Sequence, residues 1–395
     1  MARDFDKPIL NKRGEPLKIL EIGAHHCIRC IKKARALQTL GYEIHGSGEM
    51  LAHGTGFYNT YNVWQTKKQL QNMIRLYVNQ GIDIIEYNNE PDHPVSWIRE
   101  VLDDMGKTGE VPLVTDLHDL DCIRKDIIPI AERRMFNDSD ALIYAAMPIR
   151  ESVNQLHQVT KPNTVMYSYC NEGIIEYDPN HISQRGACVY EGGANPPDDE
   201  ALNQQFAYRY LYEIFKQIVE MGNELHLFCG NLGAFQTHQN IGAVAYPPTP
   251  YEKMMEELVK FKYGLCIFNN EDGEKNQVNF TLTNKAQEYL QAGLPSIVCW
   301  APETEKYTQK HNIGFCFEHV DKIGNLDQTI TQDMYLEVMD NISKKRKELV
   351  MENFIWKLEN LYAGLLNVDR KSIPENIKQL NIFEFGEEDI NNLLI

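Results

Sequence analysis

Short runs of β-branched and other apolar residues alternate with longer amphipathic stretches along most of this chain, and no other feature limits the possible folds as strongly. The apolar run Leu17–Ile22 precedes a helical stretch from about Cys27 to Leu40, and the helical stretch Gln65–Gln80 precedes the apolar run Ile82–Tyr87. Parallel strands need helical crossovers between them, so this order is typical of parallel sheets covered by helices. We therefore expect an α/β protein.

The alternation is interrupted by one polar stretch, NEGIIEYDPNHISQRG, which begins at Asn171. A chain of 395 residues is also too long for one ordinary domain. We expect one domain over residues 1–180 and a second over residues 181–345, with a helical tail over 346–395 whose return to the first domain is left open. Within these domains we expect single helices over Glu200–Met221 and Gln332–Leu366, and a helix near Cys122–Phe136.

Charge argues against one class of partner. The formal net charge of −17 repels a phosphate backbone, so a broad nucleic-acid surface is not expected. Basic residues gather in two places, which we interpret as solvated helix faces. They are Arg29, Lys32, Lys33 and Arg35 in the first helix, and the run from Lys344 to Lys347.

The N-terminal residues lack the apolar core of a signal peptide, and no stretch approaches the roughly 18 apolar residues of a membrane span. Most of the nine cysteines stand alone within apolar runs, as reduced, buried cysteines do. Those singled out are Cys188, Cys229, Cys266, Cys299 and Cys316. These features predict a cytoplasmic protein.

The segment His25–Cys30, HHCIRC, contains a C-x-x-C spacing at the start of a helix and two adjacent histidines. Such a spacing is typical of redox motifs, and the histidines are typical of zinc sites. However, no second pair of ligands stands at a suitable distance, and the chain is far longer than a thioredoxin-like unit. We therefore expect neither a redox nor a metal role for this segment.

The most informative segment is TLTNKAQEYLQAGLPSIV, which begins at Thr281. Thr281, Thr283 and Asn284 are all good helix caps, and Gly293 ends the predicted helix. A helix N-terminus with hydroxyl groups and Lys285 is suited to a diphosphate, and a glutamate one turn later, Glu288, is suited to a ribose. A surface Lys–Glu pair on an ordinary capped helix would explain the same spacing.

The motif K-x-x-E-Y-L-x-x-G-L-P in this segment resembles the nucleotide-binding helix of GT-B glycosyltransferases, especially the family-4-like group. Lys285, Glu288, Tyr289, Gly293 and Pro295 are among the matching positions. The resemblance implies two Rossmann-like domains whose parallel sheets face a central cleft, with a nucleotide-sugar donor held by the second domain. It extends weakly over most of the chain and is specific between about Tyr246 and Val298.

The resemblance also implies roles for individual residues. Lys285 would neutralise the diphosphate, helped by Thr281, Thr283 and Asn284, and Glu288 would hold the ribose. Gly192 and Gly193 match the family's glycine turn, where the backbone must come close to phosphate. The basic residue that often follows this turn is absent, and Arg209 is our candidate replacement.

One position departs from the family pattern. Many retaining members carry a second glutamate eight positions before the ribose-binding one, and this chain has Phe280 there. The alternatives for contact with the donor sugar are Glu271, Asp272 and Glu274. The stereochemical outcome is therefore left open between retention and inversion.

Two polar clusters complete the candidate site. His118 and Asp119 follow a predicted strand and resemble the family's cleft histidine, so we expect them to be catalytic, with Asp119 or Asp121 as a base. Asn88, Glu90 and His93 follow another strand and are placed on the acceptor side, although a polar turn before a helix would also explain them. The resemblance places His25 on the acceptor side as well, because its loop would border the cleft. Asp138-Ser139-Asp140 matches the D-x-D of metal-dependent glycosyltransferases, but in unsuitable surroundings.

The predicted function is transfer of a sugar from a nucleotide-sugar co-substrate to an unidentified acceptor, with no cofactor and no metal. Two alternatives stay open. One is an epimerase or phosphorylase on the same fold. The other is a catalytically silent module that binds a nucleotide-sugar or a partner protein, which Phe280 and the altered glycine turn would favour.

Overall fold

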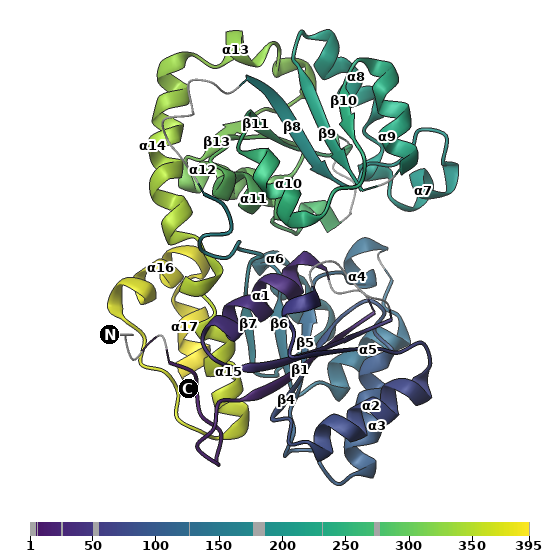
Figure 1. Ribbon diagram of the computed structural model, residues 1–395, viewed down its shortest axis with the longest axis vertical. Coiled ribbons are helices and arrows are strands. Elements are labelled where there is room, and N and C mark those ends of the chain that lie inside the picture. The colour runs from purple at the N-terminus through teal and green to yellow at the C-terminus, as the bar shows by residue number, and fades with distance from the viewer. Residues whose placement is uncertain are drawn as a thin grey trace. The chain divides into compact units, whose positions relative to one another are not determined.

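The computed structural model describes residues 5, 7–24, 27–49, 55–125, 127–176, 186–230, 232–271 and 277–394. The chain divides into two compact units, each drawn in Figure 1 with its element labels. The first unit comprises Met1–Asn171 together with Met351–Ile395, and the second comprises Glu172–Val350.

A seven-stranded sheet with the order β3-β2-β1-β4-β5-β6-β7 forms the centre of the first unit. All of its neighbouring strands are parallel. The strands are β1 (Lys18–Gly23), β2 (Glu43–Gly48), β3 (Thr60–Val63), β4 (Ile84–Asn88), β5 (Leu113–Leu117), β6 (Ala141–Tyr144) and β7 (Asn163–Val165). The helices are α1 (Ile28–Thr39), α2 (Lys67–Asn79), α3 (Pro94–Asp104), α4 (Asp121–Arg124), α5 (Ile130–Asp138), α6 (Met147–His157), α15 (Trp356–Leu366), α16 (Glu375–Phe385) and α17 (Glu387–Leu394).

The second unit contains a six-stranded parallel sheet with the order β10-β9-β8-β11-β12-β13. Its strands are β8 (Gly186–Gly192), β9 (Leu225–Cys229), β10 (Val244–Tyr246), β11 (Phe261–Ile267), β12 (Ser296–Cys299) and β13 (Gly314–Cys316). Its helices are α7 (Glu200–Gln205), α8 (Tyr212–Glu220), α9 (Leu232–His238), α10 (Tyr251–Leu258), α11 (Asn284–Ala292), α12 (Pro302–His311), α13 (Leu326–Thr329) and α14 (Gln332–Glu348).

Both sheets confirm the predicted α/β class and share one topological property. The strand order reverses between β1 and β4 in the first unit and between β8 and β11 in the second. In open parallel sheets, ligands bind beyond the carboxyl ends of the strands at such a reversal. This directs attention to the residues that follow β8 and β11, and separately to those that follow β4 and β5.

Three predicted helices are wrong in their extent. The stretch Glu200–Met221 contains α7, a 3-10 turn (Ala207–Arg209) and α8 instead of one helix. The predicted tail helix Gln332–Leu366 is divided into α14 and α15 at the boundary between the two units. The helix expected near Cys122–Phe136 is likewise two helices, α4 and α5. Strands β3 and β13 were not predicted, because TYNV is largely exposed and GFC is only half-buried, so neither shows the apolar run of a buried strand.

The solvated basic face expected on the first helix is also wrong. Arg29, Lys32 and Lys33 are all buried. Arg29 Nη2 lies 3.0 Å from Asp116 Oδ1, and Lys33 pairs with both Asp116 and Glu86. Helical periodicity identifies one face but not its environment, and here the charges of that face are neutralised by carboxylates from β4 and β5.

Residues 351–395 pack into the first unit. The Tyr362 hydroxyl in α15 donates to Glu86 of β4, and Lys357 in the same helix forms a 2.7 Å ion pair with Asp389 of α17. Both members of that pair are fully buried. The C-terminal segment therefore supplies polar groups that the first sheet needs.

The cysteines mostly follow the prediction. Cys188, Cys229, Cys266 and Cys299 are buried, whereas Cys316 is partly exposed. Among the described residues, no helix combines the length and the apolar character that crossing a membrane requires.

Candidate functional site

The turn after β8 is shaped by two glycines that lie directly beneath two cationic side chains. Gly192 has a φ of +117°, and a Cβ at this position would lie 3.1 Å from Lys285 Nζ. A Cβ at Gly193 would lie 3.4 Å from the Arg209 guanidinium. The structure therefore brings Arg209 and Lys285 to a pair of glycines from which both are distant in the sequence.

Lys285, the second residue of α11, is held by aromatic rings. Its ammonium lies 4.8 Å from the centre of the Tyr190 ring and 4.9 Å from that of Phe268. Within the described ranges, no carboxylate pairs with this lysine. A cation that faces π-systems instead of a carboxylate keeps its charge available to an anionic ligand.

Arg209 ends the 3-10 turn between α7 and α8. Its guanidinium lies 5.4 Å from the ring centres of both Phe206 and Tyr208. The turn is fixed by Asn195. Its side chain donates hydrogen bonds to the carbonyls of Leu202 and Phe206, and its backbone N–H donates one to the Arg209 carbonyl. The break that was not predicted in this helix is thus what directs Arg209 towards Gly193.

The N-terminus of α11, which carries Lys285, belongs to the same candidate site as the Gly192–Gly193 turn. Thr283 occupies the N-cap position, but its side chain makes no capping hydrogen bond and instead contacts Thr304 Oγ1 and Cys266 Sγ. The backbone N–H groups of Asn284 and Lys285 form no hydrogen bond to any described residue. The Thr281 hydroxyl donates to the Gln277 carbonyl at 3.0 Å. Two open N–H groups beside two cations form a strongly electropositive corner.

The rest of the helix motif is buried. Glu288 is only 2% exposed, one turn after Lys285. The Tyr289 hydroxyl accepts a hydrogen bond from the Glu191 N–H at 3.1 Å, and its ring lies against Gly264, where any side chain would clash. Tyr289 therefore locks α11 against the end of β8. The helical spacing of Ala286, Tyr289 and Leu290 predicts an inward face, and all three are buried. Gln287, Glu288 and Gln291 are buried as well, which argues against the alternative of a surface Lys–Glu pair.

In the first unit, His118 and Asp119 lie in the turn after β5. Asn89 holds this turn, since its Oδ1 accepts the His118 N–H at 2.8 Å and its Nδ2 donates to the Asp119 carbonyl. His118 Nε2 lies 3.9 Å from Asp119 Oδ2, and both side chains are partly exposed. Asp121 is instead paired with Arg124 and Lys125.

The three remaining acceptor-side candidates in the described chain do not converge. Asn88 is buried between Glu21 and Lys33, Glu90 is exposed and pairs with Arg124, and the His93 ring packs on Trp97. Asn89, which sequence reasoning passed over, is the residue of this loop that contacts the His118 turn. His25 lies outside the described residues.

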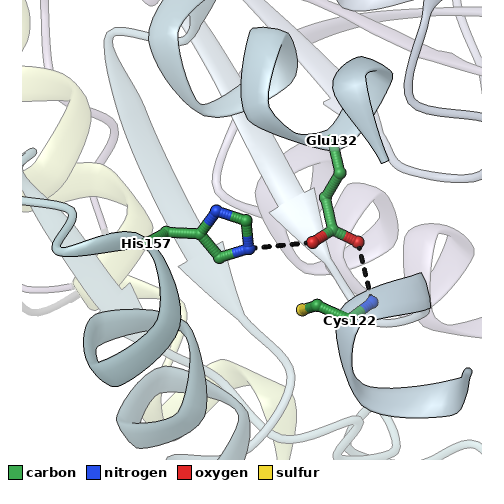
Figure 2. Close-up of side chains that lie close together, drawn as sticks. All are labelled: Cys122, Glu132 and His157. Carbon is green, nitrogen blue, oxygen red and sulfur yellow. Dashed lines mark hydrogen bonds and ion pairs between the residues drawn. The ribbon is translucent and has the colours of Figure 1, made fainter. Parts of the chain in front are cut away.

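Cys122, Glu132 and His157 form the one group of three side chains in the described chain that could hold a metal ion, and Figure 2 shows them converging from α4, α5 and α6. Glu132 accepts hydrogen bonds from the Cys122 N–H at 3.1 Å and from His157 Nε2 at 2.9 Å. Burial and the neighbouring Glu132 raise the pKa of the Cys122 thiol. Glu132 thus anchors the segment that follows His118 without needing an ion.

Other sequence candidates have ordinary structural roles. Asp138 accepts a hydrogen bond from Ser96 and Asp140 pairs with Arg99, which accounts for the D-x-D pattern. Glu271 pairs with His319 at 3.3 Å, whereas Asp272 and Glu274 lie outside the described residues.

Comparison with known proteins supplies the wider context. Sucrose-phosphate synthase from Thermosynechococcus elongatus aligns with a TM-score of 0.62 at 11% identity, over 89% of this chain and 100% of the other. AviGT4, a glycosyltransferase involved in avilamycin A biosynthesis, aligns with a TM-score of 0.56 at 10% identity, over 90% and 100%. UGT89C1 from Arabidopsis thaliana aligns with a TM-score of 0.50 at 11% identity, over 88% and 99%.

The chain has the GT-B glycosyltransferase fold. In addition, residues 210–360 match the family model described as glucosyltransferase 3-like, C-terminal domain. No curated protein sequence matches. The GT-B resemblance expected from the sequence is thereby confirmed, and the narrower likeness to the family-4-like group stays a prediction. The matched residues include Lys285 and Glu288, the centre of the motif on which the resemblance depends.

Proposed function

We propose that this GT-B chain transfers a sugar from a nucleotide-diphosphate-sugar donor to an acceptor, and that the second unit holds the donor. The observation that carries the proposal is the placement of Lys285 and Arg209 on the Gly192–Gly193 turn, beside the open N-terminus of α11. The GT-B fold and the glucosyltransferase 3-like match support glycosyl transfer in general.

The chemistry follows from where charge develops. When the bond from the sugar to the diphosphate breaks, negative charge accumulates on the leaving diphosphate. Lys285, Arg209 and the N–H groups of Asn284 and Lys285 stabilise that charge without a metal. Thr281 and Thr283 stay candidates for hydroxyl contacts with the diphosphate, for which their protons must turn away from Gln277 and Cys266. Glu288 is the candidate that holds the ribose. Gly192 and Gly193 let the backbone approach the phosphates.

His118 is the proposed catalytic group of the first unit. Asn89 holds the backbone of its turn, and the proposed role of the imidazole is to hydrogen-bond the donor sugar or to orient an acceptor hydroxyl, with Asp119 as its neighbour. His118→Ala should lower turnover more than it lowers donor affinity. Asn88, Glu90 and His93 stay candidates for the acceptor side.

The test is whether a donor is consumed only when an acceptor is present. Nucleotide-sugars that stabilise the protein in a thermal-shift panel are incubated with and without candidate acceptors, and release of free nucleotide is followed. Acceptor-dependent release supports the proposal. Release or isomerisation without an acceptor indicates a phosphorylase or an epimerase instead.

One observation favours the silent alternative. Phe280 stands where many retaining members carry a carboxylate. If a nucleotide-sugar binds but is never consumed with any acceptor, the chain is a binding module.

A further inference from the structure

Two thiols that the proposed transfer does not use lie together at the start of α1. Cys27 is the residue immediately before this helix, and Cys30 lies in its first turn. Their Sγ atoms are 3.5 Å apart. Since a disulfide bond is about 2.0 Å long, a small side-chain movement closes the gap. Sequence analysis set this C-x-x-C aside because no second ligand pair accompanies it and the chain is far longer than a thioredoxin-like unit, but neither argument bears on whether the two sulfurs face each other.

The two thiols differ in access. Cys30 is fully buried, whereas Cys27 is partly exposed. A dissolved oxidant therefore meets Cys27 first, with Cys30 directly behind it. This is the arrangement of an attacking thiol and a resolving thiol.

The pKa values of the two thiols also differ, in the direction that makes Cys27 the attacking thiol. The hydrogen bond from the Cys30 thiol holds the pKa of Cys27 well below its usual range against the effect of burial, and the nearby His118 acts in the same direction. Burial raises the pKa of Cys30. Burial also raises the pKa of Cys188, Cys229 and Cys266 to about 12, so these thiols are unreactive.

The start of α1 is rigidly held. Arg29 and Lys33 are fixed on Asp116 by buried ion pairs, so the backbone that carries both cysteines is anchored to β5. The short distance between the two sulfurs is therefore a property of an anchored segment.

We propose that Cys27 and Cys30 form a reversible dithiol/disulfide pair that reacts with hydrogen peroxide. The Cys27 thiolate attacks one peroxide oxygen, forming a sulfenic acid as the O–O bond breaks and hydroxide leaves. The Cys30 sulfur then attacks the Cys27 sulfur, forming the S–S bond and expelling the second hydroxide. The proton of each thiol ends on one of the two water molecules produced, so two thiols are oxidised and one peroxide is reduced. This inference does not depend on the proposed sugar transfer.

The experiment uses the full-length protein. After brief exposure to dilute hydrogen peroxide, free thiols are blocked with N-ethylmaleimide and peptides are mapped by mass spectrometry. We expect a Cys27–Cys30 disulfide that dithiothreitol reverses. In Cys30→Ser the reaction should stop at a Cys27 sulfenic acid that dimedone labels. The matched control Cys299→Ser, which removes a buried thiol of the second unit, should oxidise like the wild type.

A second measurement keeps the inference testable if a variant does not fold. In the reduced wild type, iodoacetamide should modify Cys27 about tenfold faster than any other cysteine, because an ordinary thiol is only a few per cent ionised at neutral pH. The inference is overturned if Cys27 and Cys30 both stay alkylatable after peroxide treatment, or if another cysteine reacts first.

Discussion

Gly192 is the residue of the candidate site at which any side chain would disturb both the backbone and a neighbour. Its φ of +117° disfavours an L-residue, and a Cβ there would press on Lys285. We expect Gly192→Ala to lower the free energy of unfolding by about 1–3 kcal/mol and to weaken nucleoside-diphosphate binding. Urea unfolding and calorimetric titration measure the two effects.

Gly193→Ala is the matched control. Its new Cβ would meet Arg209 only at an ordinary contact distance of 3.4 Å. It should therefore lose less stability than Gly192→Ala. Equal losses in the two variants would contradict the strain assigned to position 192.

The sequence could identify most of these residues but not their surroundings. Lys285, Gly192 and Gly193 stand in recognisable local patterns. Nothing local marks Tyr190 and Phe268 as the rings that hold Lys285, because their proximity depends on the pairing of β8 with β11. Asn89 was missed for the same reason, since it reaches the His118 turn from a neighbouring strand.

At the scale of elements, the break between α7 and α8 is the feature that helical periodicity could not predict. Periodicity continues across Glu200–Met221, but tertiary hydrogen bonds from Asn195 end the first helix at Gln205. Asn195→Ala should therefore release Arg209 and weaken nucleoside-diphosphate binding, measured by titration calorimetry. Asn223→Ala removes three side-chain hydrogen bonds elsewhere in the unit, two donated to the Ile218 and Gly324 carbonyls and one accepted from the Leu326 N–H. Asn223→Ala should leave nucleoside-diphosphate affinity unchanged. A loss of affinity as large as that of Asn195→Ala would exclude a specific role of Asn195 in positioning Arg209.

The buried charges between α1 and the first sheet give an element-scale prediction on pH. Burial and the nearby Glu86 raise the pKa of Glu21 from its ordinary 4.5 to about 8. Protonated Glu21 leaves two cations, Arg29 and Lys33, balanced by two carboxylates, Asp116 and Glu86. The native state therefore binds more protons than the unfolded state between these pH values, and Glu21 makes stability fall as pH rises from 4.5 to 8.

Glu21→Gln should remove this dependence. The variant should gain stability relative to the wild type as the pH rises from 5 towards 8, measured as the urea midpoint at several pH values. Parallel pH profiles for the two proteins would show that Glu21 does not carry a raised pKa.

At the scale of the whole molecule, the alternation of strand and helix was sufficient to predict two parallel-sheet units. It could not predict that the last residues belong to the first unit, because that depends on contacts between segments about 200 or more residues apart, such as Tyr362 with Glu86. The buried basic face of α1 was missed for the same reason. Its neutralising carboxylates come from β4 and β5.

Residues 351–395 contribute the buried ion pair Lys357–Asp389, on which we expect the stability of the first unit to depend. Asp389→Asn should lower the free energy of unfolding by about 3–5 kcal/mol, because it leaves the buried Lys357 ammonium without its partner. Its exposed neighbour gives the control. Glu388→Gln weakens a pair in which only Glu388 is exposed, and the buried Arg150 keeps Asp389 as a neighbour, so stability should change by less than about 1 kcal/mol. Similar losses in the free energy of chemical unfolding for the two variants would contradict the structural role of the Lys357–Asp389 pair.

The central claim is that Lys285 binds the diphosphate of a donor. The most direct test is calorimetric titration with uridine, guanosine, adenosine and thymidine diphosphates, using the wild type, Lys285→Met and Lys262→Met. Lys262 is a matched control, since it also lies over two aromatic rings of the second unit, those of Tyr263 and Tyr335.

We predict that at least one diphosphate binds the wild type and Lys262→Met equally. Lys285→Met should bind it about 10- to 100-fold more weakly, as expected for the loss of a charged hydrogen bond. Equal affinity of Lys285→Met and the wild type, or no binding of any diphosphate to the wild type, would contradict the account.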